Sequence, residues 1–216
     1  MPTQQEVSKV TKGYERLGVL ILDGSGSMRE QHPSGQTKAE AINSTVKEFI
    51  TALKNHPEEP NLFLSIITYD EDVSLNIPPT PVSNFDPNGD YNPLDGHGGM
   101  TAIGDALEKG FEVAYNFLKE SSGYPRYAII ILMTDGKNTT GNDPIEVSNK
   151  IHQRVREAEL GKKFRRICAL GFGDPNDKES LDVDTLKAIV SEDKWYLQTM
   201  DPNEIVSFFL STVLNK

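Results

Sequence analysis

One segment of the sequence alternates oxygen-bearing side chains with glycine. It reads Asp23-Gly24-Ser25-Gly26-Ser27. Glycine lets the backbone turn sharply, so one carboxylate and two hydroxyl groups in such a segment can converge on a single point. A convergent set of this kind has the composition of a cation site.

Two further segments add the same kind of side chain. Thr101 follows two glycines and a methionine, and Asp135 stands between an apolar run and Gly136. Taken alone, Thr101 is explained as a helix cap and Asp135 as a turn residue. Taken together, two carboxylates and three hydroxyls, with no thiolate and no helical histidine pair, form an all-oxygen set that suits a hard divalent cation. We therefore predict a metal site that favours Mg²⁺ over Zn²⁺, with Mn²⁺ or Ca²⁺ as alternatives, at Asp23, Ser25, Ser27, Thr101 and Asp135.

Short apolar segments precede these residues and are expected to position them. Runs of successive β-branched and apolar residues predict strands that are buried on both faces. Four segments have this pattern: residues 17–22, 62–68, 127–133 and 167–172. Two weaker strands are expected at 73–77, antiparallel after an acidic turn, and at 194–198.

Helices are expected between the strands. Apolar residues recur at helical spacing over residues 37–54 and again after Thr101. Asp143-Pro144 and Asp201-Pro202 each combine an N-cap carboxylate with proline at the first helical position, and Gly161 offers a stop for the first of these helices. A shorter helix is expected over residues 184–190.

This alternation predicts an α/β fold of the doubly wound, Rossmann-like class. We expect a three-layer sandwich with a mainly parallel six-stranded sheet, one antiparallel edge strand, and helices on both faces. Residues 1–216 are expected to form a single domain, with residues 1–15 as a short N-terminal extension. Ligands of such folds bind at the carboxyl ends of the strands. The polar segments 29–36 and 78–100 are therefore expected to surround the site and to contribute specificity.

Composition narrows the classes of partner. The chain has 216 residues with 22 basic and 32 acidic side chains, which gives a formal net charge of −10. This charge disfavours nucleic acid and anionic membranes as partners. The longest apolar run, residues 128–133, is too short to cross a bilayer, so no membrane insertion is expected. A single cysteine excludes an internal disulfide, and no secretory signal is visible, so we expect a cytoplasmic protein.

These motifs resemble the metal-ion-dependent adhesion site of the von Willebrand factor A (VWA) family. In that resemblance Asp23, Ser25 and Ser27 match the first motif, Thr101 matches the isolated threonine, and Asp135 matches the final aspartate. The resemblance implies that the strands before Asp23 and Asp135 are neighbours. It also implies a non-enzymatic module for protein–protein interaction, in which a Mg²⁺-type ion accepts an Asp or Glu carboxylate from a partner protein.

A narrower resemblance concerns bacterial TerY-type VWA proteins of tellurium-resistance and stress clusters. Residues 64–70, 99–107 and the Phe208-Phe209 pair carry this likeness, and segment 29–36 departs from it. It implies a role in a stress or conflict-response complex, with a kinase or phosphatase encoded nearby as partner.

Two alternative functions are open from the sequence. In a haloacid-dehalogenase-like phosphohydrolase, Asp23 would be the nucleophile and Asp174 and Asp177 would hold magnesium, but Ser25 stands where that family needs a second aspartate. No phosphate-binding loop, Gly-x-Ser-x-Gly or His-Glu-x-x-His motif supports an enzyme. In the other alternative the metal site only stabilises a scaffold.

His97 is expected to be a solvated loop residue.

Overall fold

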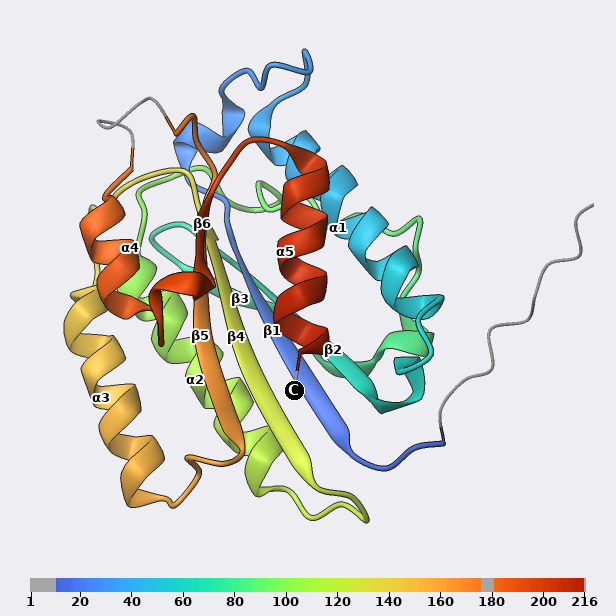
Figure 1. The fold of residues 1–216 in the computed structure, drawn as a ribbon. Coiled ribbons are helices and arrows are strands. Elements are labelled where there is room, and N and C mark those ends of the chain that lie inside the picture. The colour runs from blue at the N-terminus through green and yellow to red at the C-terminus, as the bar shows by residue number, and fades with distance from the viewer. Residues whose placement is uncertain (1–10, 176–180, 216) are drawn as a thin grey trace, which may run out of the picture.

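The computed structural model describes residues 11–175 and 181–215 (Figure 1). Six strands form one sheet in the order β3-β2-β1-β4-β5-β6. All neighbouring pairs are parallel except β2 and β3, which are antiparallel. The strands are β1 Glu15–Asp23, β2 Leu62–Tyr69, β3 Val73–Pro81, β4 Arg126–Thr134, β5 Phe164–Gly171 and β6 Tyr196–Gln198. The predicted fold class is confirmed, including the adjacency of β1 and β4.

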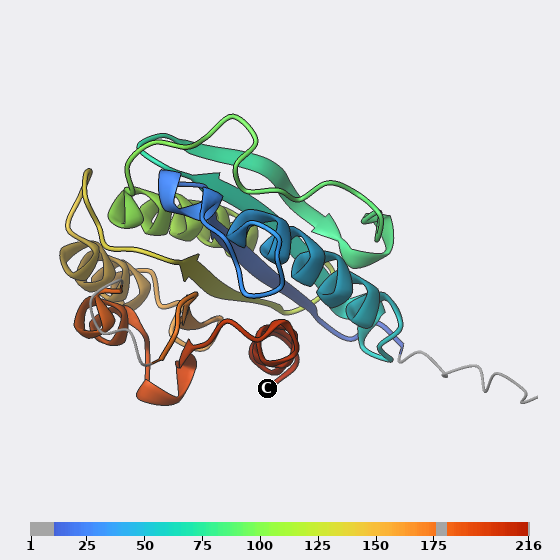
Figure 2. The ribbon, with the colours of Figure 1, turned by 90° about the horizontal axis from the view of Figure 1, so that it is seen from above.

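Helices cover both faces of the sheet (Figure 2). They are α1 Lys38–Lys54, α2 Ile103–Lys119, α3 Pro144–Glu157, α4 Val183–Ile189 and α5 Pro202–Leu214, and short 3-10 turns occur at η1 Gly26–Arg29, η2 Glu59–Asn61, η3 Val82–Asn84 and η4 Asp193–Trp195. Helices α2, α3 and α4 contribute to one apolar core, and α1 and α5 contribute to the other. Within the described residues, no helix is both long and apolar enough to cross a membrane.

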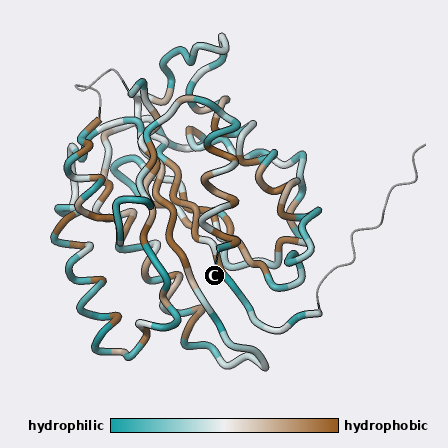
Figure 3. Tube along the Cα trace, in the orientation of Figure 1, coloured by the Kyte–Doolittle hydropathy of each residue, from teal (hydrophilic) through white to brown (hydrophobic). Residues whose placement is uncertain are grey.

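The central strands are apolar along most of their length (Figure 3). Every residue of β1 is buried, and along β4 successive residues alternate between the two cores: Ile130 belongs to one and Ile131 to the other. A strand with helices on both faces has no solvated side, so it needs a continuous apolar run rather than an alternating one. Two of the predicted site residues lie at the carboxyl ends of these strands: Asp23 ends β1, and Asp135 follows β4.

The starts of α3 and α5 agree with the predicted capping chemistry, and α1 has a cap that was not predicted. The Thr37 side chain caps α1 in a capping box with Glu40, and Asp143 and Asp201 cap α3 and α5, each with proline in the first turn. Helix α3 ends at Glu157, before the glycine expected to stop it.

Several element boundaries differ from the prediction. Strand β3 continues through Pro78 and Pro79 to Pro81, whereas the sequence indicated a loop from residue 78. Proline is tolerated there because β3 is an edge strand, which does not need every backbone N–H for pairing. Strand β5 begins and ends earlier than predicted, and η4 precedes β6. Residues 1–10 of the expected extension lie outside the described residues, and Glu15, its last residue, already begins β1.

Candidate metal centre

The carboxyl ends of the neighbouring strands β1 and β4 lie beside Asp23, the first carboxylate of the predicted set. Asp23 is the last residue of β1, and Thr134 is the last residue of β4. The Thr134 hydroxyl donates to Asp23 Oδ2 over 2.6 Å, and the Tyr69 hydroxyl lies 3.4 Å from the same oxygen. Asp135, the second predicted carboxylate, follows Thr134 directly.

The two serines connect the two carboxylates. Asp23 Oδ1 accepts the backbone N–H of Ser25 over 2.8 Å, so the carboxylate holds the turn that begins η1. The hydroxyl oxygens of Ser25 and Ser27 are 3.2 Å apart, and the Ser27 hydroxyl donates to Asp135 Oδ1 over 2.6 Å. Four of the five predicted residues therefore form one hydrogen-bonded network.

Thr101 lies beside this network. Its backbone is fixed to the segment after β4, because its carbonyl accepts the Thr139 N–H over 2.9 Å and its N–H donates to the Thr139 hydroxyl over 2.9 Å. Its own hydroxyl is 4.0 Å from the place that a Cβ on Gly136 would occupy. Among the described residues the Thr101 side chain makes no hydrogen bond, so the hydroxyl remains available for a ligand.

The two carboxylates share a site with little solvent. Asp23 is fully buried and Asp135 is 3% exposed. Burial, followed by the negative charge of Asp135, raises the pKa of Asp23 to about 6, although hydrogen bonds from Thr134 and Ser25 oppose the shift. Two neighbouring buried carboxylates repel each other, and a cation between them relieves this repulsion.

Lys38 supplies one such charge and was not predicted from the sequence. Its Nζ donates to Asp135 Oδ2 over 2.8 Å and to Glu30 Oε2 over 2.7 Å. Burial alone would lower the pKa of Lys38, but its bonds to Asp135 and Glu30 raise that pKa above its ordinary value. Its position in the sequence offered one signal. Lys38 is the first residue of α1, and a lysine is unusual there because the amino-terminal end of a helix favours negative charge.

Asp70 and His97 hold the loop that leads to Thr101. Asp70 Oδ2 accepts the N–H groups of Gly98 and Gly99 over 2.9 and 3.0 Å, and Asp70 Oδ1 lies 2.9 Å from His97 Nδ1. The His97 side chain is only 3% exposed, so the expectation of a solvated histidine is wrong. The Gly99 carbonyl in turn accepts the Gly26 N–H over 2.9 Å, which joins this loop to the first motif.

The donor chemistry fits a hard divalent cation. Within the described residues, no group of three or more His, Cys, Asp or Glu side chains is placed to hold a metal. The set instead combines two carboxylates with hydroxyl groups, which are the oxygen ligands that Mg²⁺, Mn²⁺ and Ca²⁺ prefer.

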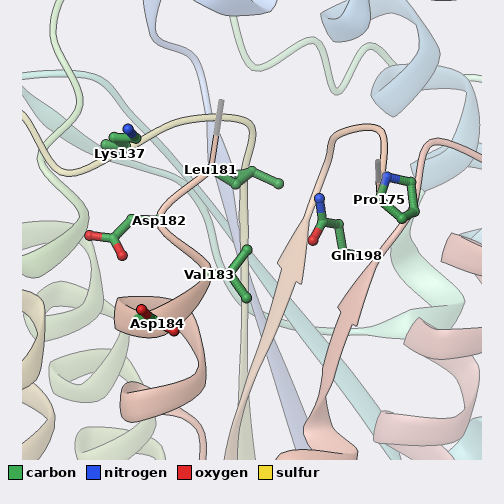
Figure 4. A pocket seen from close by; sticks show the side chains of 7 residues that line it. All are labelled: Lys137, Pro175, Leu181, Asp182, Val183, Asp184 and Gln198. Carbon is green, nitrogen blue, oxygen red and sulfur yellow. The ribbon is translucent and has the colours of Figure 1, made fainter. Parts of the chain in front are cut away.

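The geometry does not favour Asp23 as a nucleophile. Both of its oxygens accept hydrogen bonds, and it has no exposed surface through which a phosphate ester could approach. The Asp174 carbonyl accepts a hydrogen bond from Gln198, and Asp177, the other proposed magnesium ligand, lies outside the described residues. A pocket of ≈ 600 Å³ lies nearby but contains none of the five predicted metal ligands (Figure 4). Its lining residues are Lys137, Pro175, Leu181, Asp182, Val183, Asp184 and Gln198.

Comparison with known proteins gives one family and many structures. A family model described as the von Willebrand factor type A domain matches residues 19–137, a range that includes all five predicted ligands. No curated protein sequence matches the chain significantly.

Solved structures share the fold at low sequence identity. Proximal thread matrix protein 1 of the mussel byssus has a TM-score of 0.63 at 16% identity, and the match covers 94% of this chain and 47% of that one. The same protein has been solved with zinc occupying its metal-ion-dependent adhesion site (MIDAS) motif. The pilus adhesin SpaC of Lactobacillus rhamnosus GG has a TM-score of 0.66 at 13% identity, with 96% and 31% covered. BatB of Bacteroides thetaiotaomicron has a TM-score of 0.59 at 17% identity, with 92% and 99% covered. The chain thus spans less than half of the mussel and pilus proteins.

Proposed function

The chain belongs to the von Willebrand factor type A domain family, and from this premise we propose that it is a metal-dependent module that binds a carboxylate of a partner protein. One observation carries the proposal: Asp23, Ser25, Ser27 and Asp135 form a continuous hydrogen-bonded network at the carboxyl ends of β1 and β4. Thr101 lies beside this network with an available hydroxyl.

The roles of the residues follow from their charge. Ser25, Ser27 and Thr101 hold the ion through their hydroxyl oxygens, which bring no formal charge. Asp23 and Asp135 contribute negative charge directly or through water. An ion held largely by neutral ligands keeps much of its affinity for an additional anionic oxygen. An Asp or Glu side chain of the partner supplies that oxygen.

We propose Mg²⁺ as the resident ion. The oxygen-only donor set supports a hard cation, and Mn²⁺ and Ca²⁺ are the alternatives. The zinc in the MIDAS motif of the mussel protein makes Zn²⁺ a necessary comparison in any titration. Competition among these ions, measured by calorimetry on protein stripped with EDTA, ranks them.

Ser27→Ala tests the proposal. Ser27 bonds both to Ser25 and to Asp135, so its loss should weaken partner capture at least about tenfold, which corresponds to one charge-assisted bond. The measurement is a pull-down from lysate with and without EDTA, and circular dichroism checks the fold.

Ser44→Ala is the matched control because Ser44 is exposed on α1, away from the network. Capture that is unchanged by both EDTA and Ser27→Ala contradicts the proposal. If chelation lowers the melting temperature while capture persists, the ion only stabilises a scaffold.

The finer assignment is a bacterial, cytoplasmic, TerY-type protein of a tellurium-resistance or stress-response complex, formed as a single domain over residues 1–216. Its support is the similarity of residues 64–70, 99–107 and 208–209 to that group. A kinase or phosphatase partner is part of this assignment. Mass spectrometry of proteins that EDTA releases from the immobilised chain tests it.

A further inference from the structure

Arg16 lies near the start of β1, and Arg165 and Arg166 lie near the start of β5. These strand ends are at the opposite end of the sheet from the metal site (Figure 1). Residues 162–166 read Lys-Lys-Phe-Arg-Arg, in a chain whose net charge is −10. Arg16 of β1 adds a third guanidinium to this cluster. Burial lowers the pKa of both Arg16 and Arg166, and the nearby positive charge of Arg165 lowers both further. The local charge is therefore opposite to that of the whole molecule.

Carboxylates act on this cluster only from beyond ion-pair distance: the charges of Glu58 and Glu192 raise the pKa of Arg16 and Arg166 against the effect of burial. Among the described residues, no Asp or Glu oxygen lies within the 4.0 Å of an ion pair from Arg16, Arg165 or Arg166. Arg16 instead donates to the Val213 and Leu214 carbonyls over 2.7 and 2.9 Å at the end of α5. The neighbouring cations differ: Arg126 pairs with Glu15 and Glu120, and Lys194 pairs with Glu192.

Two guanidinium nitrogens have no hydrogen-bond partner within the described part of the chain. They are Arg16 Nε and Arg166 Nη1, and both are buried. Arg166 is 7% exposed and stacks on Trp195 at 3.9 Å. To the described residues, its Nη2 makes only a 3.4 Å bond, to the Asn215 carbonyl. A buried charged donor without an acceptor is costly, so an anion that supplies acceptors nearby has a large favourable effect.

Arg166 also lines a pocket. The pocket has a volume of ≈ 540 Å³ and is lined by Gly161, Arg165, Arg166, Glu192, Lys194, Trp195 and Asn215. Arg165 is exposed on β5, and its one contact given among residues 11–175 and 181–215 is with the Tyr127 ring, at 4.3 Å. Its guanidinium can therefore bind a ligand without losing a hydrogen bond to those residues. The pocket thus combines one free and one under-satisfied guanidinium.

The two guanidinium groups of the pocket suit a compact, multiply charged anion. Guanidinium groups bind phosphate oxygens through paired, parallel hydrogen bonds. Stacking with a nucleobase is disfavoured, because Arg166 and Lys194 lie over the Trp195 ring and that ring also packs against both cores. We propose that this pocket binds a phosphate group, either as inorganic phosphate or as a phosphorylated side chain. This inference does not rest on the proposed metal-dependent function.

Calorimetry with defined probes tests the proposal. The probes are inorganic phosphate, an acidic peptide that contains phosphoserine, and the same peptide without the phosphate. Each is titrated into the full chain in the presence of EDTA. Arg165→Gln should weaken phosphate binding about tenfold, because one charge-assisted fork is lost. Arg154→Gln is the control, since Arg154 stacks on Phe111 and Tyr115 outside this pocket. Affinity should also fall as salt is raised.

Each outcome decides the proposal. Binding of phosphate or phosphopeptide that Arg165→Gln weakens and Arg154→Gln preserves supports it, and the stronger of the two probes identifies the source of the phosphate. No binding of either probe by the wild-type chain overturns it. Equal affinity in wild type and Arg165→Gln, or equal affinity for the unphosphorylated peptide, also overturns it. EDTA is present throughout, so these results are independent of the metal site.

Discussion

Asp135 is the residue at which opposite charges compete in the candidate metal centre. One of its oxygens accepts the Ser27 hydroxyl, and the other accepts the Lys38 ammonium. A divalent cation bound at this carboxylate lies close to a second positive charge in a site with little solvent to screen it. We therefore expect Lys38 to lower the affinity of the proposed site for cations, because it already neutralises Asp135.

The substitution Lys38→Met tests this competition. It removes the ammonium and keeps much of the side-chain length, so the affinity for Mg²⁺ should rise about tenfold, the value of one charge-assisted hydrogen bond. Calorimetric titration of EDTA-stripped protein measures the change. Lys47→Met on the same helix controls for the loss of one positive charge. A lower affinity in Lys38→Met would mean that Lys38 orients Asp135 for the ion instead of competing with it.

The sequence predicts site residues only where they belong to a local motif. Asp23, Ser25 and Ser27 are recognisable because their spacing alone brings three oxygen atoms together. Lys38 bonds to Asp135, which lies 97 positions later in the chain, and Asp70 bonds to Gly98, which lies 28 positions later. Their roles therefore depend on the three-dimensional packing of loops. The burial of His97 depends on packing in the same way, because nothing in its sequence neighbours reveals the hydrogen bonds with Thr68 and Asp70.

At the level of elements, the loop between β3 and α2 is fixed by the turn after β2. Burial alone would raise the pKa of Asp70, but hydrogen bonds from His97 and from the backbone N–H groups of Asp72, Gly99 and Gly98 outweigh it and lower the pKa to about 2. The folded state therefore prefers the ionised carboxylate. Thr101 depends on this anchor because the Ala102 N–H also donates to the Asp70 carbonyl, over 2.8 Å.

The variant Asp70→Asn should show the dependence of stability on pH. A depressed pKa means that the carboxylate stabilises the fold above about pH 4, and that this contribution is lost as the pH falls from about 4 to about 2. Asp70→Asn should therefore melt at a lower temperature than wild type at pH 7, and the difference should shrink toward pH 2. Asp72→Asn, an exposed carboxylate in the same turn, is the control. A constant difference across this pH range would contradict the assigned role.

Elements with strong periodicity or capping chemistry were predictable, and their exact ends were not. The strand before Asp23 is apolar throughout because helices cover both of its faces, and this signal is independent of tertiary detail. The extension of β3 to Pro81 had the opposite signal, since proline usually indicates a loop. Proline costs little at the edge of a sheet, where its missing N–H is not needed for pairing. The edge position of β3 follows from the topology of the sheet and not from the local sequence.

At the level of the whole molecule, ion binding should stabilise the fold. A ligand that binds only the folded state raises the unfolding free energy by about 2.7 kcal/mol at a hundred times its dissociation constant. Mg²⁺ should therefore raise the melting temperature of EDTA-stripped protein, and Asp23→Ala should abolish the shift. Asp95→Ala, in the exposed part of the loop before α2, should retain it. An equal shift in wild type and Asp23→Ala would place the stabilising ion elsewhere.

The overall architecture was the most predictable level. Alternating strand and helix patterns with right-handed crossovers leave few arrangements, and the adjacency of β1 and β4 is one that brings Asp23 and Asp135 together. The basic edge was not predicted, because the net charge of −10 conceals it and because Arg16 joins residues 165–166 only through the folded sheet.

The prolines of β3 have a consequence for self-association. Pro78, Pro79 and Pro81 deprive the outer strand of three amide donors, and β6 at the opposite edge has only three residues. A further strand from another molecule would find an incomplete hydrogen-bonding template on either side. The native sheet is thus resistant to polymerisation by strand addition. Contacts with other molecules are left to side chains at the two ends of the strands and on the outer surfaces of the helices.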